Sequence, residues 1–275
     1  MPKQGVITMK KDGKFLHFSI DEFDQWLKDT RFNRIVTLIQ NHHTYIPGYS
    51  HFKGNNHFAL LKSMEQSHIE RGFDQIAQNL TTFPDGTVAV CRPFERIPAG
   101  IKGANTSGLC IENTGNFDMG GDVMNETHRD AIVRVNALLC REFNLVPATD
   151  SIVYHHWYDL TSGARTDGSG TTKTCPGTAF FGGNSVTAAA AGFIPLVTSM
   201  LGTLGESAHI TAGSKYQAAV TATNLNVRCS CNGSASIVRA LKQGVVVNVY
   251  EEANGWCRIN STEQHWVAGK FLRIL

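Results

Sequence analysis

Long uninterrupted apolar runs are missing from this sequence. The longest apolar-leaning stretch, residues 186–204, is broken by Gly192, by Pro195 and by several Thr and Ser residues. A membrane-spanning helix needs about 20 consecutive apolar residues, so we expect no membrane span. The first residues lead to Lys10 and Lys11 without an apolar core or a small-residue cleavage site. We therefore expect synthesis in the cytoplasm without a secretory signal.

Charge of one sign is also scarce. The 25 Lys and Arg residues nearly balance the 23 Asp and Glu residues, which gives a formal net charge of +2. Proteins that bind nucleic acid usually carry a marked basic excess, so no nucleic-acid partner is expected. The apolar fraction of 42% and the charged fraction of 17% suit a globular protein. A length of 275 residues allows one large or two ordinary domains.

The cysteines offer no disulfide framework. There are seven of them, an odd number, and Cys229 and Cys231 are too close in sequence to pair easily. These features fit a reducing compartment. Free Cys residues are most often small buried apolar side chains, and we expect this of every one except Cys175.

Apolar patterns in the first 200 residues predict strands and helices. A β-branched run at 34–40 predicts a buried strand that ends in Asn41-His42-His43-Thr44. Ser19 is expected to cap a short helix. By the same criteria, further strands are predicted at 76–83, 87–91, 109–112 and 152–154, and helices at 58–71, 125–143 and 186–200, with Pro195 kinking or splitting the last helix.

The composition changes after residue 200. Residues 201–217 have the mixture of Gly, Ser and Thr that is typical of a linker. Residues 218–275 contain only short β-type runs separated by Gly and Asn turns. The sequence therefore predicts a domain over residues 1–200, a linker at 201–217 and a small all-β module at 218–275.

Three separate segments carry candidate metal ligands. His42 and His43 end one predicted strand, His155 and His156 follow another, and Cys175 lies in a Lys-Thr-Cys-Pro-Gly segment. Zinc binds imidazole nitrogen and thiolate sulfur, and a catalytic zinc site keeps its fourth position for water. Neighbouring side chains of a strand point to opposite faces, so only one His of each pair can face a shared site. Taken singly, each of these His residues would be an ordinary core or surface residue.

The order of these motifs over about residues 33–200 resembles the zinc-dependent N-acetylmuramoyl-L-alanine amidases, which share a fold with phage lysozyme-type amidases and peptidoglycan recognition proteins. The most specific part of the resemblance is Lys173 to Gly177 combined with the two His-bearing strands. It implies an α/β fold in which a mixed central β-sheet is flanked by helices.

The resemblance also implies roles for individual residues. His42, His155 and Cys175 match the zinc ligands of the family. Zinc lowers the pKa of bound water to about 7. Glu112 matches the general base that takes the water proton, and Lys173 matches the cation that stabilises the oxyanion. The alternative for Glu112 and Lys173 is an ordinary solvated position at a strand end or in a loop.

One position departs from the family pattern. Some members carry a Tyr on the strand before the Asp85-Gly86 turn, where this chain has Gln78. Glu112 indicates that the chain follows the branch that uses glutamate as the base. The segment 159–172 is longer than in compact members, and it either shapes the substrate groove or is only a surface excursion. Residues 163–172 are rich in Gly, Ser and Thr and are expected to be an exposed loop.

The last part of the chain resembles a bacterial SH3-like cell-wall-binding domain over about residues 218–275. The matching pieces are Leu225 to Arg228, Asn254-Gly255-Trp256 and Trp266-Val267. Cys229 to Asn232 replace the usual Ser-Gly-Pro after the Arg, which weakens the case for a binding role of that loop. A tethered wall-binding module would raise the local concentration of the catalytic domain at its substrate.

Together these features predict a two-domain peptidoglycan hydrolase, either an endolysin or an autolysin. The expected reaction is zinc-dependent cleavage of the amide between N-acetylmuramic acid and L-alanine, at the bacterial cell wall after release from the cytoplasm. One alternative is a non-catalytic peptidoglycan-recognition protein on the same fold. Another is a Cys-His hydrolase in which Cys175 is the nucleophile.

Overall fold

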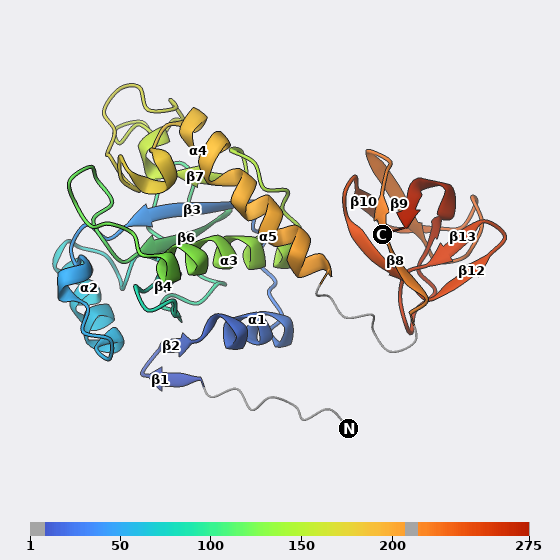
Figure 1. Cartoon of the computed structure of the whole chain (residues 1–275), viewed down its shortest axis with the longest axis horizontal. Coiled ribbons are helices and arrows are strands. Elements are labelled where there is room, and N and C mark those ends of the chain that lie inside the picture. The colour runs from blue at the N-terminus through green and yellow to red at the C-terminus, as the bar shows by residue number, and fades with distance from the viewer. Residues whose placement is uncertain (1–8, 207–213, 275) are drawn as a thin grey trace. The chain divides into compact units, whose positions relative to one another are not determined.

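The computed structural model of this chain describes residues 9–206 and 214–274 (Figure 1). The chain divides into two compact units between Gly202 and Thr203. The first unit contains a β-sheet and helices. Beyond helix α5 (Ile194–Glu206), the second unit consists of strands, turns and one short 3₁₀ segment, Gly269–Phe271.

A seven-stranded sheet forms the centre of the first unit. Its strands are β1 (Lys10–Asp12), β2 (Phe15–Phe18), β3 (Leu38–His43), β4 (Leu80–Thr82), β5 (Val88–Val90), β6 (Gly108–Asn113) and β7 (Ile152–Tyr154), in the spatial order β1-β2-β5-β4-β6-β3-β7. Strands β4, β6, β3 and β7 are parallel, whereas β1, β2 and β5 pair antiparallel. The predicted α/β fold with a mixed sheet is confirmed.

Two helices of the first unit, at 20–29 and 126–142, begin after residues whose side chains satisfy free backbone N–H groups. Ser19 and Glu22 form a reciprocal capping box at the start of α1, and Asn125 accepts from the backbone N–H of His128 at the start of α3. The helices of the first unit are α1 (Ile20–Asp29), α2 (His57–Glu70), α3 (Glu126–Glu142), α4 (Val186–Gly192) and α5, with short 3₁₀ segments η1 (Tyr49–His51), η2 (His155–Trp157) and η3 (Phe180–Gly182).

The two faces of β3 have different neighbours. The Asn41 side chain donates to Asn136 of α3 over 2.8 Å, so this face lies against α3. The next residue, His42, lines a cavity together with Met64 and His68 of α2. Because side chains alternate along a strand, α3 covers one face of the sheet and α2 covers the face that carries His42.

Two boundaries differ from the sequence-based prediction. The strand predicted at 34–40 begins only at Leu38, because its partner β6 begins at Gly108, in register with Leu38. Arg34 instead donates to backbone carbonyls of the surrounding loops. The predicted linker 201–217 is also too long: α5 continues to Glu206 and the next strand begins at Tyr216, while residues 207–213 of the predicted linker lie outside the described residues.

The closing helical stretch divides near Pro195, as predicted. Helix α4 ends at Gly192 and α5 begins at Ile194, so Pro195 lies in the first turn of α5, where its missing N–H costs no hydrogen bond. Among the described residues, Val186–Leu204 is one stretch that is long and apolar enough to cross a membrane by length and composition. A single stretch of this kind is weak support for a span, because helices of soluble proteins pass the same test.

The second unit is an all-β structure, as predicted from the SH3-like motifs. A five-stranded sheet has the order β10-β9-β14-β13-β12, and a three-stranded sheet has the order β11-β8-β15. Apolar side chains from both sheets form one core, which includes Val227, Val249 and Val267. The strands are β8 (Tyr216–Val220), β9 (Asn224–Arg228), β10 (Ile237–Lys242), β11 (Val246–Val249), β12 (Glu251–Ala253), β13 (Trp256–Arg258), β14 (Trp266–Ala268) and β15 (Leu272–Ile274).

A buried chain of hydrogen bonds links α3 to β3. Thr82 Oγ1 donates to Asn113 Oδ1 over 2.8 Å, so the single hydroxyl proton is used and Thr82 must accept from His128 Nε2, also at 2.8 Å. Burial lowers the pKa of His128 to about 3, so the ring is neutral, and its unprotonated Nδ1 accepts from the Tyr49 hydroxyl at 2.9 Å. Asn113 Nδ2 donates to the backbone carbonyl of His42 over 2.8 Å. A proton on Nδ1 would replace the bond accepted from Tyr49, so this set of hydrogen bonds requires the neutral ring.

This requirement predicts that the first unit loses stability in mild acid. Burial lowers the pKa of His128 to about 3, against about 6.5 in an unfolded chain. The unfolded state therefore binds an additional proton as the pH falls below 6.5. Stability from His128 is complete above pH 6.5 and falls by about 1.4 kcal/mol per pH unit towards pH 3.

Amide hydrogen exchange of α3 between pH 7.5 and 5, expressed as opening free energy, measures this slope. The His128→Gln variant lacks the titrating ring and should show a shallower slope, whereas exposed His51→Gln should match the wild type. Equal slopes in all three proteins would contradict the assignment of the acid sensitivity to His128.

Candidate metal centre

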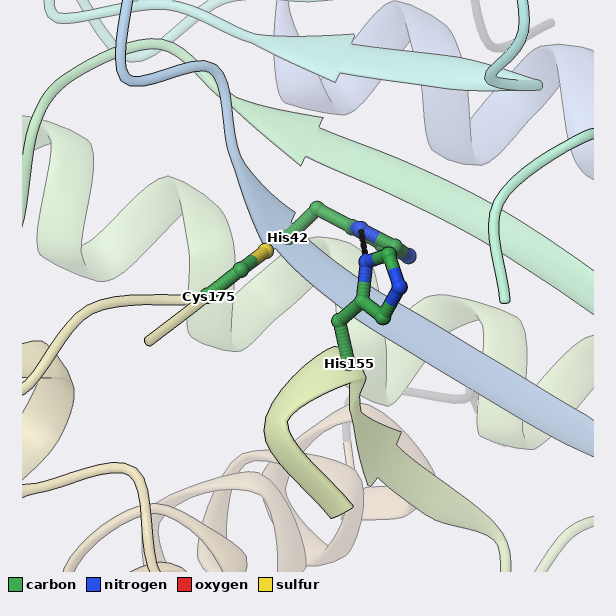
Figure 2. Close-up of side chains that lie close together, drawn as sticks. All are labelled: His42, His155 and Cys175. Carbon is green, nitrogen blue, oxygen red and sulfur yellow. Dashed lines mark hydrogen bonds between the residues drawn. The ribbon is translucent and has the colours of Figure 1, made fainter. Parts of the chain in front are cut away.

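Parallel strand pairing brings two imidazoles together. Asn41 of β3 is in register with Tyr154 of β7, so the residues that follow, His42 and His155, lie side by side. Their Nδ1 atoms are 3.2 Å apart (Figure 2). The sulfur of Cys175 points toward the same place from a loop, and one donor atom from each of the three side chains lies within 4.8 Å of the others. All three residues are buried.

The neighbouring His residues are engaged elsewhere. His43 Nδ1 accepts from the backbone N–H of Phe117 at 3.1 Å, and His43 is not part of the donor group, although its side chain lies near it. His156 Nδ1 donates to the carbonyl of Lys173 over 2.7 Å. His155 and His156 lie in the 3₁₀ turn η2 and not in a strand, so the alternation argument used for this pair was wrong. It is the turn that separates the two rings.

A network around Asp118 holds the loop that carries Cys175. The Asp118 carboxylate accepts from the Thr174 hydroxyl at 2.9 Å and from the Thr178 backbone N–H at 3.0 Å. The backbone N–H of His156 donates to the carbonyl of Cys175 over 2.8 Å. The η2 turn and the Cys175 loop are thus joined directly, which fixes two of the three donor groups relative to each other.

Burial controls the protonation of these side chains. It lowers the pKa of His42 well below its usual value and that of His155 to about 4, so both rings are neutral at pH 7. Burial, and then the charge of Glu112, raise the pKa of the Cys175 thiol well above its usual value. A buried protonated thiol is a poor nucleophile, which argues against the Cys-His hydrolase alternative.

The three donors fit a zinc ion. Neutral imidazole nitrogens and a Cys sulfur are the ligands that zinc prefers, and two nitrogens bound tetrahedrally at about 2.0–2.1 Å lie about 3.3–3.4 Å apart. The observed Nδ1 separation of 3.2 Å is close to this spacing. A nearby divalent cation would also favour the thiolate over the protonated thiol. The group therefore offers three ligands and leaves a fourth position open.

Glu112 lies beside this group. It is in register with His42 on the adjacent parallel strand, and its Oε1 is 3.9 Å from His42 Nδ1. Its Oε2 is buried and has no hydrogen-bond partner among the described residues. Burial raises the pKa of Glu112 to about 8, although the charges of Lys173 and Arg71 oppose this shift. Like Lys173 and Arg71, a cation in the adjacent site would act to lower the pKa of Glu112.

A cavity of about 600 Å³ opens onto the donor group, and it is lined by His42, Glu112, His155, Lys173 and Cys175, all of which the sequence singled out.

Gln78, the position that departs from the family pattern, is fully buried and donates to Thr81 over 3.0 Å; it does not line the cavity. Sequence reasoning missed Tyr45, Ile46 and Arg71, which also line the cavity.

Comparison with known proteins agrees with these features. The N-acetylmuramoyl-L-alanine amidase family matches residues 32–178, and the bacterial SH3 domain family matches residues 223–273. No curated protein sequence matches the chain.

Solved structures share the fold of the first unit at low identity. Drosophila PGRP-LB is 18% identical, with 55% of this chain and 79% of that chain covered and a TM-score of 0.44. The amidase LysC from Clostridium intestinale URNW is 18% identical over 55% and 82%, with a TM-score of 0.42. The Ph2119 endolysin from Thermus scotoductus MAT2119 bacteriophage Ph2119 is 20% identical over 60% and 93%, with a TM-score of 0.41.

The family match determines the assignment of the first unit, because it covers more than half of the 275 residues. The chain belongs to the N-acetylmuramoyl-L-alanine amidase family and carries a bacterial SH3 domain after the amidase region.

Proposed function

We propose that the first unit hydrolyses the amide between N-acetylmuramic acid and the L-alanine of the peptidoglycan stem peptide, and that it does so with zinc held by His42, His155 and Cys175. The observation that carries the proposal is the convergence of these three donors with Glu112 at one cavity. Zinc bound there would polarise the scissile carbonyl and make water more acidic.

Glu112 is the proposed general base. Its carboxylate lies at the cavity wall beside His42 and makes no competing hydrogen bond through Oε2 within the described residues. It would take a proton from the attacking water and return it to the nitrogen of L-alanine as the carbon–nitrogen bond breaks. Within residues 9–206 and 214–274, Glu112 is the carboxylate that lines the cavity, so both proton transfers are assigned to it.

Lys173 is the proposed oxyanion stabiliser. Its side chain is exposed and lines the cavity, and its charge acts on His42, His155 and Glu112. The hydrogen bond from His156 to the Lys173 carbonyl fixes the backbone at this position. An ammonium group held near the scissile carbonyl would stabilise the negative charge that develops on its oxygen.

For the whole chain we propose a peptidoglycan hydrolase of the endolysin or autolysin type. The domains of this proposal are an amidase domain over residues 1–200, a linker over 201–217 and an SH3 domain over 218–275. The SH3 domain would hold the enzyme on the cell wall and raise the local substrate concentration. The enzyme would be made in the cytoplasm and act after release.

The first experiment incubates the purified chain with N-acetylmuramoyl-pentapeptide and follows the products by mass spectrometry. The proposal predicts free N-acetylmuramic acid and an intact peptide that begins with L-alanine. A chelator should abolish cleavage and added zinc should restore it. Tight binding of an uncleaved substrate by the zinc-loaded protein would instead support the recognition-protein alternative.

A second prediction separates the proposed zinc ligands from their neighbours. His42→Ala and Cys175→Ser should lose stoichiometric zinc after dialysis, because each removes one of three protein ligands. His43→Ala should retain zinc, because its ring contacts Phe117 and not the donor group. Metal analysis by mass spectrometry makes the comparison. Full zinc retention by Cys175→Ser with loss of cleavage would revive Cys175 as a nucleophile.

A third prediction concerns the general base. Glu112→Gln keeps the size of the side chain but cannot accept a proton, so kcat should fall by about 10²–10⁴ while zinc content stays unchanged. Glu65→Gln, on α2, is the matched control: Glu65 pairs with Lys14 and does not line the cavity. Turnover of Glu112→Gln within a few-fold of the wild type would exclude Glu112 as the base.

A further inference from the structure

The segment directly after β3 carries an unusual pair of exposed side chains. Tyr45 has a φ of 59°, in the left-handed region that bulky residues rarely adopt. Its side chain is 54% exposed, and that of the next residue, Ile46, is 68% exposed. Both line the cavity that contains the proposed zinc ligands. A strained backbone that presents apolar surface to a site is a recognised mark of ligand binding.

Hydrogen bonds hold this conformation in place. The backbone N–H of Tyr45 donates to the carbonyl of Gly115 over 3.0 Å, and the N–H of Gly115 donates to the Thr44 hydroxyl over 2.9 Å. That hydroxyl donates in turn to the carbonyl of Pro47 over 2.6 Å. The Tyr45 ring also contacts the His43 ring edge to face, with centroids 5.9 Å apart. The exposed pair is therefore part of a fixed surface and not of a loose turn.

Strand register shows how the cavity extends. His42 and Glu112 lie at one level of the parallel strands, and Tyr45 and Ile46 follow beyond the carboxyl end of β3. At the other end of the cavity, Gly100 lies against Gln40 and Cys110, which precede His42 and Glu112 by two residues on the same two strands. The cavity thus runs along β3, with the donor group between its two ends.

The two ends carry different side chains, and the other cation of the lining, Lys173, belongs to the loop of Cys175 beside the donor group. Arg71, at the end of α2, lines the cavity near Phe73, and its guanidinium lies over the Phe73 ring at 5.5 Å. Phe73 leads into Ala77, which precedes β4 and so lies towards the amino ends of the parallel strands. Tyr45 and Ile46, at the carboxyl ends, offer an uncharged apolar surface with one phenol group.

We propose that Tyr45 and Ile46 form the platform that binds the pyranose ring of N-acetylmuramic acid, with the stem peptide extending towards Arg71. This inference rests on the proposed amidase function. In a muramyl peptide the carboxylates belong to the stem peptide, so the peptide suits the end with the guanidinium. The sugar is uncharged once its lactyl group is amidated, and its apolar ring face suits an aromatic side chain whose hydroxyl stays in water.

The test compares two substrates that share the scissile amide. One is N-acetylmuramoyl-pentapeptide, and the other is the D-lactoyl-pentapeptide, which keeps the amide and lacks the sugar ring. Tyr45→Gly removes the ring and suits the left-handed backbone, whereas Tyr45→Trp keeps an aromatic surface. The control is Ile69→Ala, an exposed apolar residue of α2 that does not line the cavity.

The expected result is a rise in KM of roughly tenfold for the muramyl substrate with Tyr45→Gly, and little change in kcat. The lactoyl substrate should be cleaved equally by Tyr45→Gly and the wild type. Tyr45→Trp and Ile69→Ala should resemble the wild type, and zinc content should be the same in all variants. An equal loss on both substrates would overturn the platform, because the ring would then act on the peptide or on the fold.

Calorimetric titration of the zinc-loaded proteins with the muramyl peptide keeps this inference separate from the proposed function. A wild type that binds but does not cleave contradicts the amidase proposal alone, and weaker binding by Tyr45→Gly still supports the platform. Unchanged binding by Tyr45→Gly overturns the platform even if cleavage by the wild type is normal. A loss that grows with peptide length and is independent of the sugar would mean that the substrate lies in the opposite direction.

Discussion

The parallel pairing of β6, β3 and β7 is the constraint on which the site depends. It sets His42 level with Glu112 on one side and next to His155 on the other. Side chains alternate along a strand, so a slip of one residue would turn His42 towards α3 and away from His155 and Glu112. The buried bond from Asn113 to the His42 carbonyl resists that slip. The metal-ligand geometry is therefore a consequence of sheet register more than of any local motif.

Burial would make this arrangement unfavourable without a cation. Two neutral imidazoles, a protonated thiol and a carboxyl group whose pKa is raised to about 8 are gathered at one buried site. Buried polar groups without full partners destabilise a fold, and Glu112 Oε2 and His42 Nε2 have none among the described residues. A bound dication reverses the balance for the thiol and the carboxyl group. The burial of these groups would therefore both destabilise the fold without a cation and favour the binding of the cation that the proposed chemistry uses.

The sequence was most informative where residue type itself carries chemistry. His42, His155 and Cys175 stood out because few other roles explain them together, and the structure brings them within 4.8 Å. It was least informative where a partner lies far along the chain. Thr82 and His128 are 46 residues apart and neither is part of a motif. Likewise, the start of β3 depends on where its partner β6 begins.

The loop after β3 shows how one segment joins the ligand and the proposed substrate platform. His42 faces the cavity, and the backbone three residues later adopts a left-handed conformation. That conformation ends the strand and leaves the Tyr45 side chain exposed at the cavity. The loop that follows β6 contains Gly115, whose carbonyl accepts a hydrogen bond from the Tyr45 N–H. The same loop contains Phe117, whose backbone N–H donates to His43 Nδ1. Movement of this loop would change both the strand that carries His42 and the proposed sugar platform, so the proposed binding and catalysis would be coupled through backbone hydrogen bonds.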